Sequence, residues 1–160
     1  MRPLPAARSI SLAGVLMMAA CSSGGTSADD AARASFVVRA EALCTKANID
    51  LKALHAPQAA AEIPSYVHAV ATLGAGTARA LAGLTLPPKD ATALHAKFLD
   101  PLLRQSDDGI RFDLQIQKAG TDQAKVTSLL AQAPTATRAD LAFLRSYGFH
   151  ACVAAANTAR

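Results

Sequence analysis

The feature that most constrains the fold is an apolar or small side chain at every third or fourth position over long stretches of the chain. In the first stretch the repeating residues are Phe36, Ala40, Leu43, Ala47, Leu51 and Leu54. Such spacings place side chains on one face of a helix, so they predict an amphipathic helix over residues 32–55. Cys44 lies at the edge of this face and is expected to point toward the core. Pro57 follows the helix, as expected for a residue without a backbone N–H.

A second helix is predicted to open at Pro64 with Ser65 as its N-cap, and to end before Pro87. Its inner face repeats at Val67, Val70, Gly74, Thr77, Leu81 and Leu84. Gly74, Ala78 and Ala82 also form a row of small residues, which we expect to let another helix approach closely.

The third helix is predicted from Pro88 or Asp90 to about Lys118. Its expected inner face is Leu99, Leu103, Ser106, Ile110 and Leu114. Pro101 either kinks one continuous helix or is the first residue of a new helix capped by Asp100. The acidic run 107–113 does not fit a calcium loop, since its glycine stands at the wrong position for an EF-hand. We interpret this run as a salt-bridged helix surface.

The rest of the chain predicts two further helical segments. Gly120 and Asp122 form a helix stop followed by a helix start. Pro134 interrupts the next segment, and Thr135 or Thr137 can cap the restart. The last stripe runs through Leu141, Leu144, Gly148 and Cys152, where Gly148 either ends a helix or makes a close contact within one. With no strand pattern, the expected fold is all-α: an antiparallel up-down bundle of four to five helices.

The N-terminus has the pattern of an export signal. Arg2 and Arg8 accompany an apolar run, Ile10–Ala20, which is too short to span a bilayer. Small residues then precede Cys21. This arrangement resembles the lipobox of bacterial lipoproteins, which implies cleavage before Cys21 and its modification by fatty-acyl chains such as palmitate. The alternative is an ordinary secretory peptide cleaved near Ala20.

The resemblance implies three parts: a signal peptide at 1–20, a lipidated Cys21 with a flexible tether over 21–31, and a helical domain over 32–160. The chain as a whole resembles the small Ala-rich helical lipoproteins of bacterial cell envelopes, whose function is unknown. The matching features are Cys21, the helix around Cys44, the segment 86–88, and the segment 147–149 ahead of Cys152. The resemblance brings no known activity with it.

The cysteine count predicts one disulfide. If Cys21 is lipidated, Cys44 and Cys152 remain, and an exported protein folds where disulfides form. We therefore expect a Cys44–Cys152 bridge between the first helix and the C-terminal end. Two buried free thiols are the alternative.

Composition argues against several functional classes. Loss of residues 1–20 removes Arg2 and Arg8, which lowers the formal net charge from +4 to +2, so nucleic acid is not an expected partner. The four histidines, His55, His68, His95 and His150, are expected to be solvent-exposed, with no metal or other cofactor. No catalytic motif is present, so no catalytic residue is assigned and an enzyme is not expected. The Ala-rich core is expected to pack without a large cavity.

Two functional hypotheses remain. The first is a lipid-anchored module on the extracytoplasmic side of the cell membrane that binds another envelope protein or has a structural role. The second is a carrier or sensor that holds a small apolar ligand between its helices. A large apolar cavity would favour the second.

Replacing Cys21 tests the anchor. Stable anchoring takes two acyl chains or more, because a single chain binds membranes only marginally. We expect Cys21→Ala to move the protein into the soluble fraction of lysed cells. Retention of the variant in membranes after a carbonate wash would contradict the assignment.

Overall fold

The computed structural model describes residues 27–134 and 139–158. The predicted all-helical bundle is confirmed, since these two ranges contain helices and no strand. The α-helices are α1 (Ala28–Ala53), α2 (Ile63–Ala82), α3 (Ala91–Leu94), α4 (Asp100–Ala119), α5 (Gln123–Leu130), α6 (Leu141–Tyr147) and α7 (Ala151–Thr158). A 3-10 turn at Ala60–Glu62 precedes α2, and a π-helical turn at His95–Leu99 joins α3 to α4.

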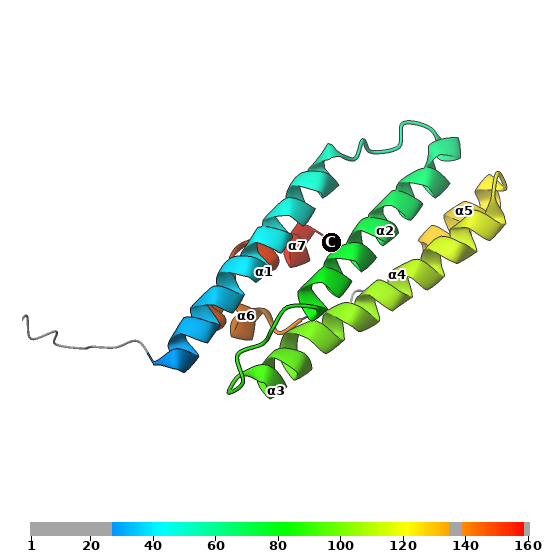
Figure 1. Ribbon diagram of the computed structural model, residues 1–160. Coiled ribbons are helices and arrows are strands. Elements are labelled where there is room, and N and C mark those ends of the chain that lie inside the picture. The colour runs from blue at the N-terminus through cyan, green and yellow to red at the C-terminus, as the bar shows by residue number, and fades with distance from the viewer. Residues whose placement is uncertain (1–26, 135–138, 159–160) are drawn as a thin grey trace, which may run out of the picture.

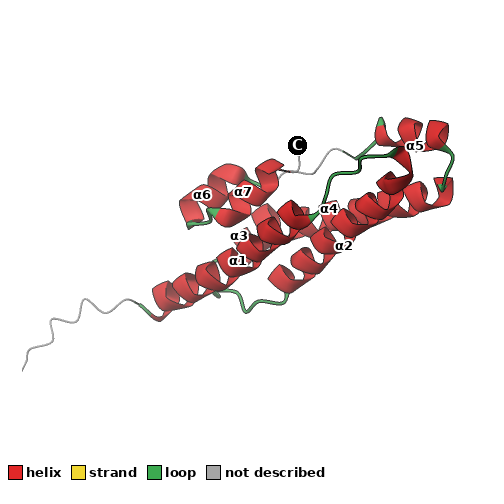
Figure 2. Cartoon of the chain, turned by 90° about the horizontal axis from the view of Figure 1, so that it is seen from above, coloured by secondary structure: helices red, strands yellow, loops and turns green. Residues whose placement is uncertain are grey.

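Three long helices form the body of the molecule. Helices α1, α2 and α4 lie side by side and follow one another in alternating directions (Figure 1). Helix α5 folds back against the end of α4, and the short pair α6 and α7 covers the other end of the bundle beside α1 (Figure 2). The chain therefore brings its last described helix back to its first, which is where the predicted disulfide requires it.

Helix α1 begins at Ala28 rather than at residue 32, so the end of the predicted tether, 28–31, is helical. The cause is a capping box at Ser27. The Ser27 hydroxyl accepts the N–H of Asp30, and the Asp30 carboxylate accepts the N–H of Ser27, each at 3.2 Å. These bonds satisfy backbone donors that the first turn of a helix leaves free.

Pro101 lies within a continuous helical run from α3 to α4, not at the start of a new helix. A proline in an α-helix leaves the carbonyl four residues earlier without its donor and clashes with it. The π-helical turn immediately before Pro101 widens the backbone, and the N–H of Asp100 reaches back to the carbonyl of His95. The free carbonyl, that of Lys97, accepts the N–H of Asp140 at 3.0 Å and so docks the start of α6.

Gly148 ends α6, which settles the alternative left open by the sequence. Its φ of 106° lies in the left-handed region, and its N–H donates to the carbonyls of Leu144 and Arg145. The guanidinium of Arg33 from α1 donates to the carbonyls of Ser146 and Tyr147 at the same helix end. The chain can therefore turn sharply between α6 and α7.

The Cys44–Cys152 disulfide is present and joins α1 to α7, with the two Cα atoms 4.9 Å apart. Beside it, the Glu41 carboxylate accepts the backbone N–H groups of Ala151 and Cys152 at 2.8 and 3.2 Å. A carboxylate at a helix N-terminus complements the positive end of the helix dipole. The amide of Asn48 donates to the carbonyl of Ala151 at 3.0 Å. Helix α7 is thus fixed to α1 by one covalent bond and three hydrogen bonds.

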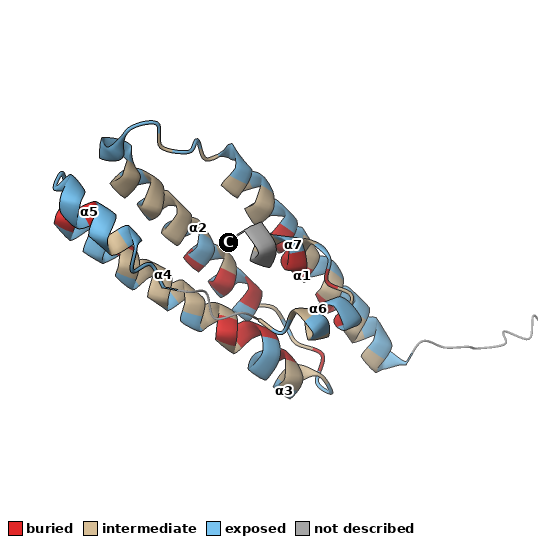
Figure 3. Cartoon of the chain, turned by 180° about the vertical axis from the view of Figure 1, so that it is seen from behind, coloured by how far each residue is buried: buried red, intermediate tan, exposed pale blue. Residues whose placement is uncertain are grey.

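The main core fills the end of the bundle where α6 and α7 meet α1, and Figure 3 shows many of the buried residues there. A smaller buried cluster of Ile116, Ala119 and Val126 lies where α5 packs against α4. Phe36 packs edge-on against Tyr147 and Phe149, and Phe98 packs against Phe149. The Tyr147 hydroxyl donates to Asp90 at 2.6 Å. Burial raises the pKa of Tyr147 above its ordinary value, and this hydrogen bond raises it further. The phenol is therefore neutral at physiological pH.

Some details of the predicted helix faces are wrong. On α4 the buried residues are Pro101, Asp113, Ile116 and Ala119, whereas Leu114 is 55% exposed. The buried face includes a carboxylate, that of Asp113, which a pattern of apolar residues does not reveal. Helix α2 begins at Ile63, so Ser65 lies inside its first turn and does not cap it. The cap of α6 is Asp140, which accepts the N–H of Phe143, while Thr135 and Thr137 lie outside the described residues.

Removal of the disulfide should destabilise the domain. We expect Cys44→Ala with Cys152→Ala, in the Cys21→Ala background, to lower the free energy of unfolding by about 2–5 kcal/mol, because the bridge closes a long loop of the unfolded chain. Urea denaturation followed by circular dichroism measures the change. An unchanged unfolding midpoint, or two alkylatable thiols in the unreduced parent protein, would contradict the role given to the bridge.

Candidate functional site: an apolar cavity between the helices

A cavity of about 340 Å³ lies between α1, α2, α4 and the C-terminal helices. This size falls within the range of about 300–1,000 Å³ that is common for small-molecule sites. Its lining is mostly apolar and includes Leu51, Val70, Leu73, Leu81, Phe98, Leu102, Leu141 and Leu144. The Ala-rich composition argues against a large internal ligand cavity, and the space found here is instead partly open to solvent.

Glycine and alanine residues leave this space open. Gly74 on α2 and Gly109 on α4 both line the cavity, and a Cβ atom added to either would meet nothing within 4 Å. Ala47 and Ala71 add two more short side chains to the lining. The prediction that Gly74 allows another helix to approach closely is wrong, because its missing side chain leaves open space that solvent reaches.

The wall of the cavity on the α7 side is firmly held. The disulfide residues Cys44 and Cys152 both belong to the lining and are almost completely buried. Asn48 also lines the cavity, and its side-chain amide donates a hydrogen bond to the carbonyl of Ala151. The hydroxyl of Thr77 donates to the carbonyl of Leu73 within α2. These contacts leave mainly aliphatic surface for a ligand.

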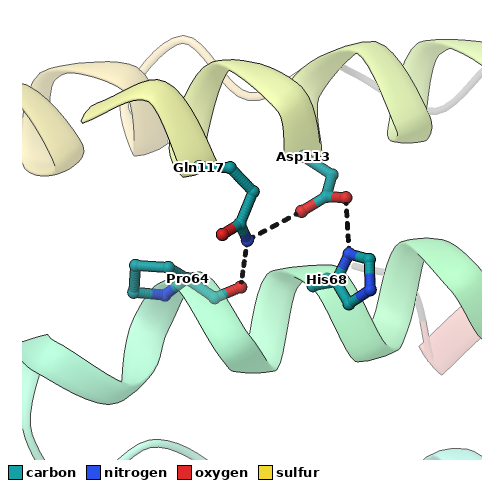
Figure 4. Close-up of polar contacts among 4 residues, drawn as sticks. All are labelled: Pro64, His68, Asp113 and Gln117. Atoms are coloured by element: carbon teal, nitrogen blue, oxygen red, sulfur yellow. Dashed lines mark hydrogen bonds and ion pairs between the residues drawn. The ribbon is translucent and has the colours of Figure 1, made fainter. Parts of the chain in front are cut away.

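Besides the cavity, a group of hydrogen-bonded polar side chains lies between α2 and α4 (Figure 4). His68 Nδ1 lies 2.8 Å from Asp113 Oδ2, and Gln117 Nε2 donates to Asp113 Oδ1 at 3.1 Å and to the Pro64 carbonyl at 2.8 Å. Asp113 is only 4% exposed, whereas the His68 side chain is 62% exposed. With its proton on Nδ1, the imidazole donates to a buried carboxylate.

The His68–Asp113 pair is best explained as a structural bridge between two helices. Burying a carboxylate is costly unless it is hydrogen-bonded, and both carboxylate oxygens of Asp113 have a donor. The described residues contain no group of three or more His, Cys, Asp and Glu side chains able to hold a metal ion. Sequence reasoning missed this pair because Asp113 belongs to the acidic run that was interpreted as helix surface.

The other predicted site residues can be placed one by one. All four histidines are exposed, as expected. In the acidic run, Asp108 pairs with Arg111 on the surface of α4, so the surface interpretation is confirmed there and wrong at Asp113. Cys44 and Cys152 are joined by the predicted bridge. Cys21 lies outside the described residues.

Comparison of the chain with protein-family models, with curated proteins and with solved structures found no match. None of the helices within residues 27–134 and 139–158 combines the length and the apolar character needed to cross a membrane. The cavity and its lining therefore provide the evidence on which a function can be proposed.

Removal of His68 should destabilise the domain more than removal of another exposed histidine. We expect His68→Ala to lower the free energy of unfolding by about 1–3 kcal/mol, because the buried Asp113 carboxylate loses a hydrogen-bond donor. His55→Ala is the matched control, and we expect it to change stability by no more than about 0.5 kcal/mol. Equal unfolding midpoints for the two variants in urea would contradict the bridging role.

Proposed function

We propose that the protein is a lipid-anchored protein of the cell envelope that carries or senses a small apolar ligand. The observation that carries this proposal is the apolar cavity between α1, α2 and α4. Aliphatic side chains provide most of its surface, and transfer of apolar ligand surface from water to such a site contributes about 25 cal/mol per Å².

The proposed location rests on the residues around Cys21 and on the Cys44–Cys152 bridge. Disulfides persist in oxidising compartments, which fits the extracytoplasmic side of a membrane. Acyl chains on Cys21 would anchor the protein there.

Binding, rather than catalysis, is the role we propose for the cavity. Asn48 and Thr77 in its lining already donate to backbone carbonyls, and the only carboxylate among its described lining residues, Asp108, pairs with Arg111. These groups hold the wall in place. We therefore assign no catalytic residue to the site.

A second candidate function is a module that binds another envelope protein. One face of α1 carries Val38, Ala42, Thr45 and Ile49 at helical spacing, and all four are exposed. Val38 is 69% and Ile49 62% exposed, so this face of α1 offers apolar surface to a partner. Crosslinking in intact cells, with Val38→Lys as the variant that should lose the partner, separates this function from ligand binding.

Filling the cavity tests the main proposal. The variants are Gly74→Leu and Gly109→Leu, because each glycine lines the cavity and has open space at its Cβ position. We expect each to weaken binding of the neutral apolar dye Nile red about tenfold or more, since overfilling a site costs about 1–3 kcal/mol. Fluorescence titration of the mature chain carrying Cys21→Ala measures binding.

Gly76→Leu is the matched control. Gly76 lies on the same helix, also has open space at its Cβ position, and does not belong to the described cavity lining. All three changes replace a glycine in a helix with a better helix former, so none should lower the melting temperature. Equal dye binding by all variants, or none by the parent protein, would contradict the proposal.

A further inference from the structure

The cavity adjoins a second hollow that opens toward the end of α1. This outer hollow has a volume of about 480 Å³ and is lined by Tyr66, Val67 and Phe112, with Lys52 at its edge. The two spaces share the lining residues Asn48, Leu51, Val70, Ala71 and Gly109. Together they form one apolar space, with the disulfide cysteines in the lining of the inner cavity and Lys52 in the lining of the outer hollow.

The charges in the lining differ between the two hollows. Lys52 is the one cation among the described residues that line the two hollows, and Asp108 is the one anion. Asp108 lines the inner cavity and is paired with Arg111. Lys52 is exposed and has no acidic partner in the described part of the chain, whereas Lys46 on the same helix pairs with Asp50 at 2.6 Å.

We infer that the ligand is a single-chain amphiphile with an anionic head group, a carboxylate or a phosphate monoester. This inference rests on the proposed function. The alkyl chain lies in the inner cavity, and the head group lies in the outer hollow beside the Lys52 ammonium and the Tyr66 hydroxyl.

Desolvation and charge fix this orientation. An ionised head group in the inner cavity would lose its water among aliphatic side chains, which costs free energy. In the outer hollow it keeps part of its hydration and meets a cation that no carboxylate of the described residues neutralises. A cationic head group there would be repelled by Lys52.

The experiment compares four ligands with the same twelve-carbon chain: dodecanoate, dodecyl phosphate, 1-dodecanol and dodecyltrimethylammonium. Each is titrated, below its micelle concentration, against Nile red bound to the mature chain carrying Cys21→Ala. We expect both anions to displace the dye at concentrations about two- to fivefold lower than the alcohol, as for an exposed ion pair. The cation should be the weakest ligand, and the better of the two anions indicates the natural head group.

Lys52→Gln should bring the anions and the alcohol to equal affinity without changing the affinity for the alcohol. Lys46→Gln is the matched control, since it removes the same charge from the same helix outside the described lining. Raising the salt concentration should weaken anion binding to the parent protein and not to Lys52→Gln.

The outcomes separate the two proposals. If all four compounds displace the dye equally well, or if the preference for anions survives Lys52→Gln, the inference on the head group is wrong and the cavity function stands. If none displaces the dye and the parent protein does not bind it, both are wrong.

Discussion

The attachment of α7 to α1 is the contact on which the rest of the structure depends. The Cys44–Cys152 bond crosses 108 residues of sequence, so it holds the last described helix against the first. Glu41 and Asn48 bind the first turn of α7 on either side of the bond, which fixes its direction as well as its position. Without this attachment the cavity would lose the part of its wall formed by Cys152.

A second constraint comes from Pro101, and it shows how a local defect becomes a tertiary contact. The proline has no N–H to donate, so one hydrogen bond is missing from the long helix, next to the π-helical turn. The Lys97 carbonyl is thereby left free for another donor. That carbonyl accepts the N–H of Asp140, the residue whose side chain caps α6. The proline thereby helps to place α6 over the core, next to the disulfide.

The sequence predicted the features that need no knowledge of how far apart the helices lie. Spacings of three and four residues located the helices, and the cysteine count paired Cys44 with Cys152, because neither argument needs the distance between helices. Features that depend on two helices were missed. Asp113 is buried only because His68 and Gln117 reach it, and Gly74 lines a cavity only because no side chain from another helix fills the space. A glycine in a helix predicts close packing or open space equally well, and the neighbouring helix decides between them.

The glycines of the cavity also link stability to the proposed function. A glycine inside a helix costs about 1 kcal/mol relative to alanine, and Gly74 and Gly109 have room for a Cβ atom. Packing therefore gives no reason for either residue, and a larger side chain at either position would fill the proposed binding space. The outer hollow lies near Lys52, which follows the first residue of α1 by about 36 Å along the helix axis at 1.5 Å per residue. If Cys21 anchors the chain ahead of α1, the opening lies at the end of the molecule farther from the anchor, where a ligand would arrive through the aqueous compartment or from a partner protein.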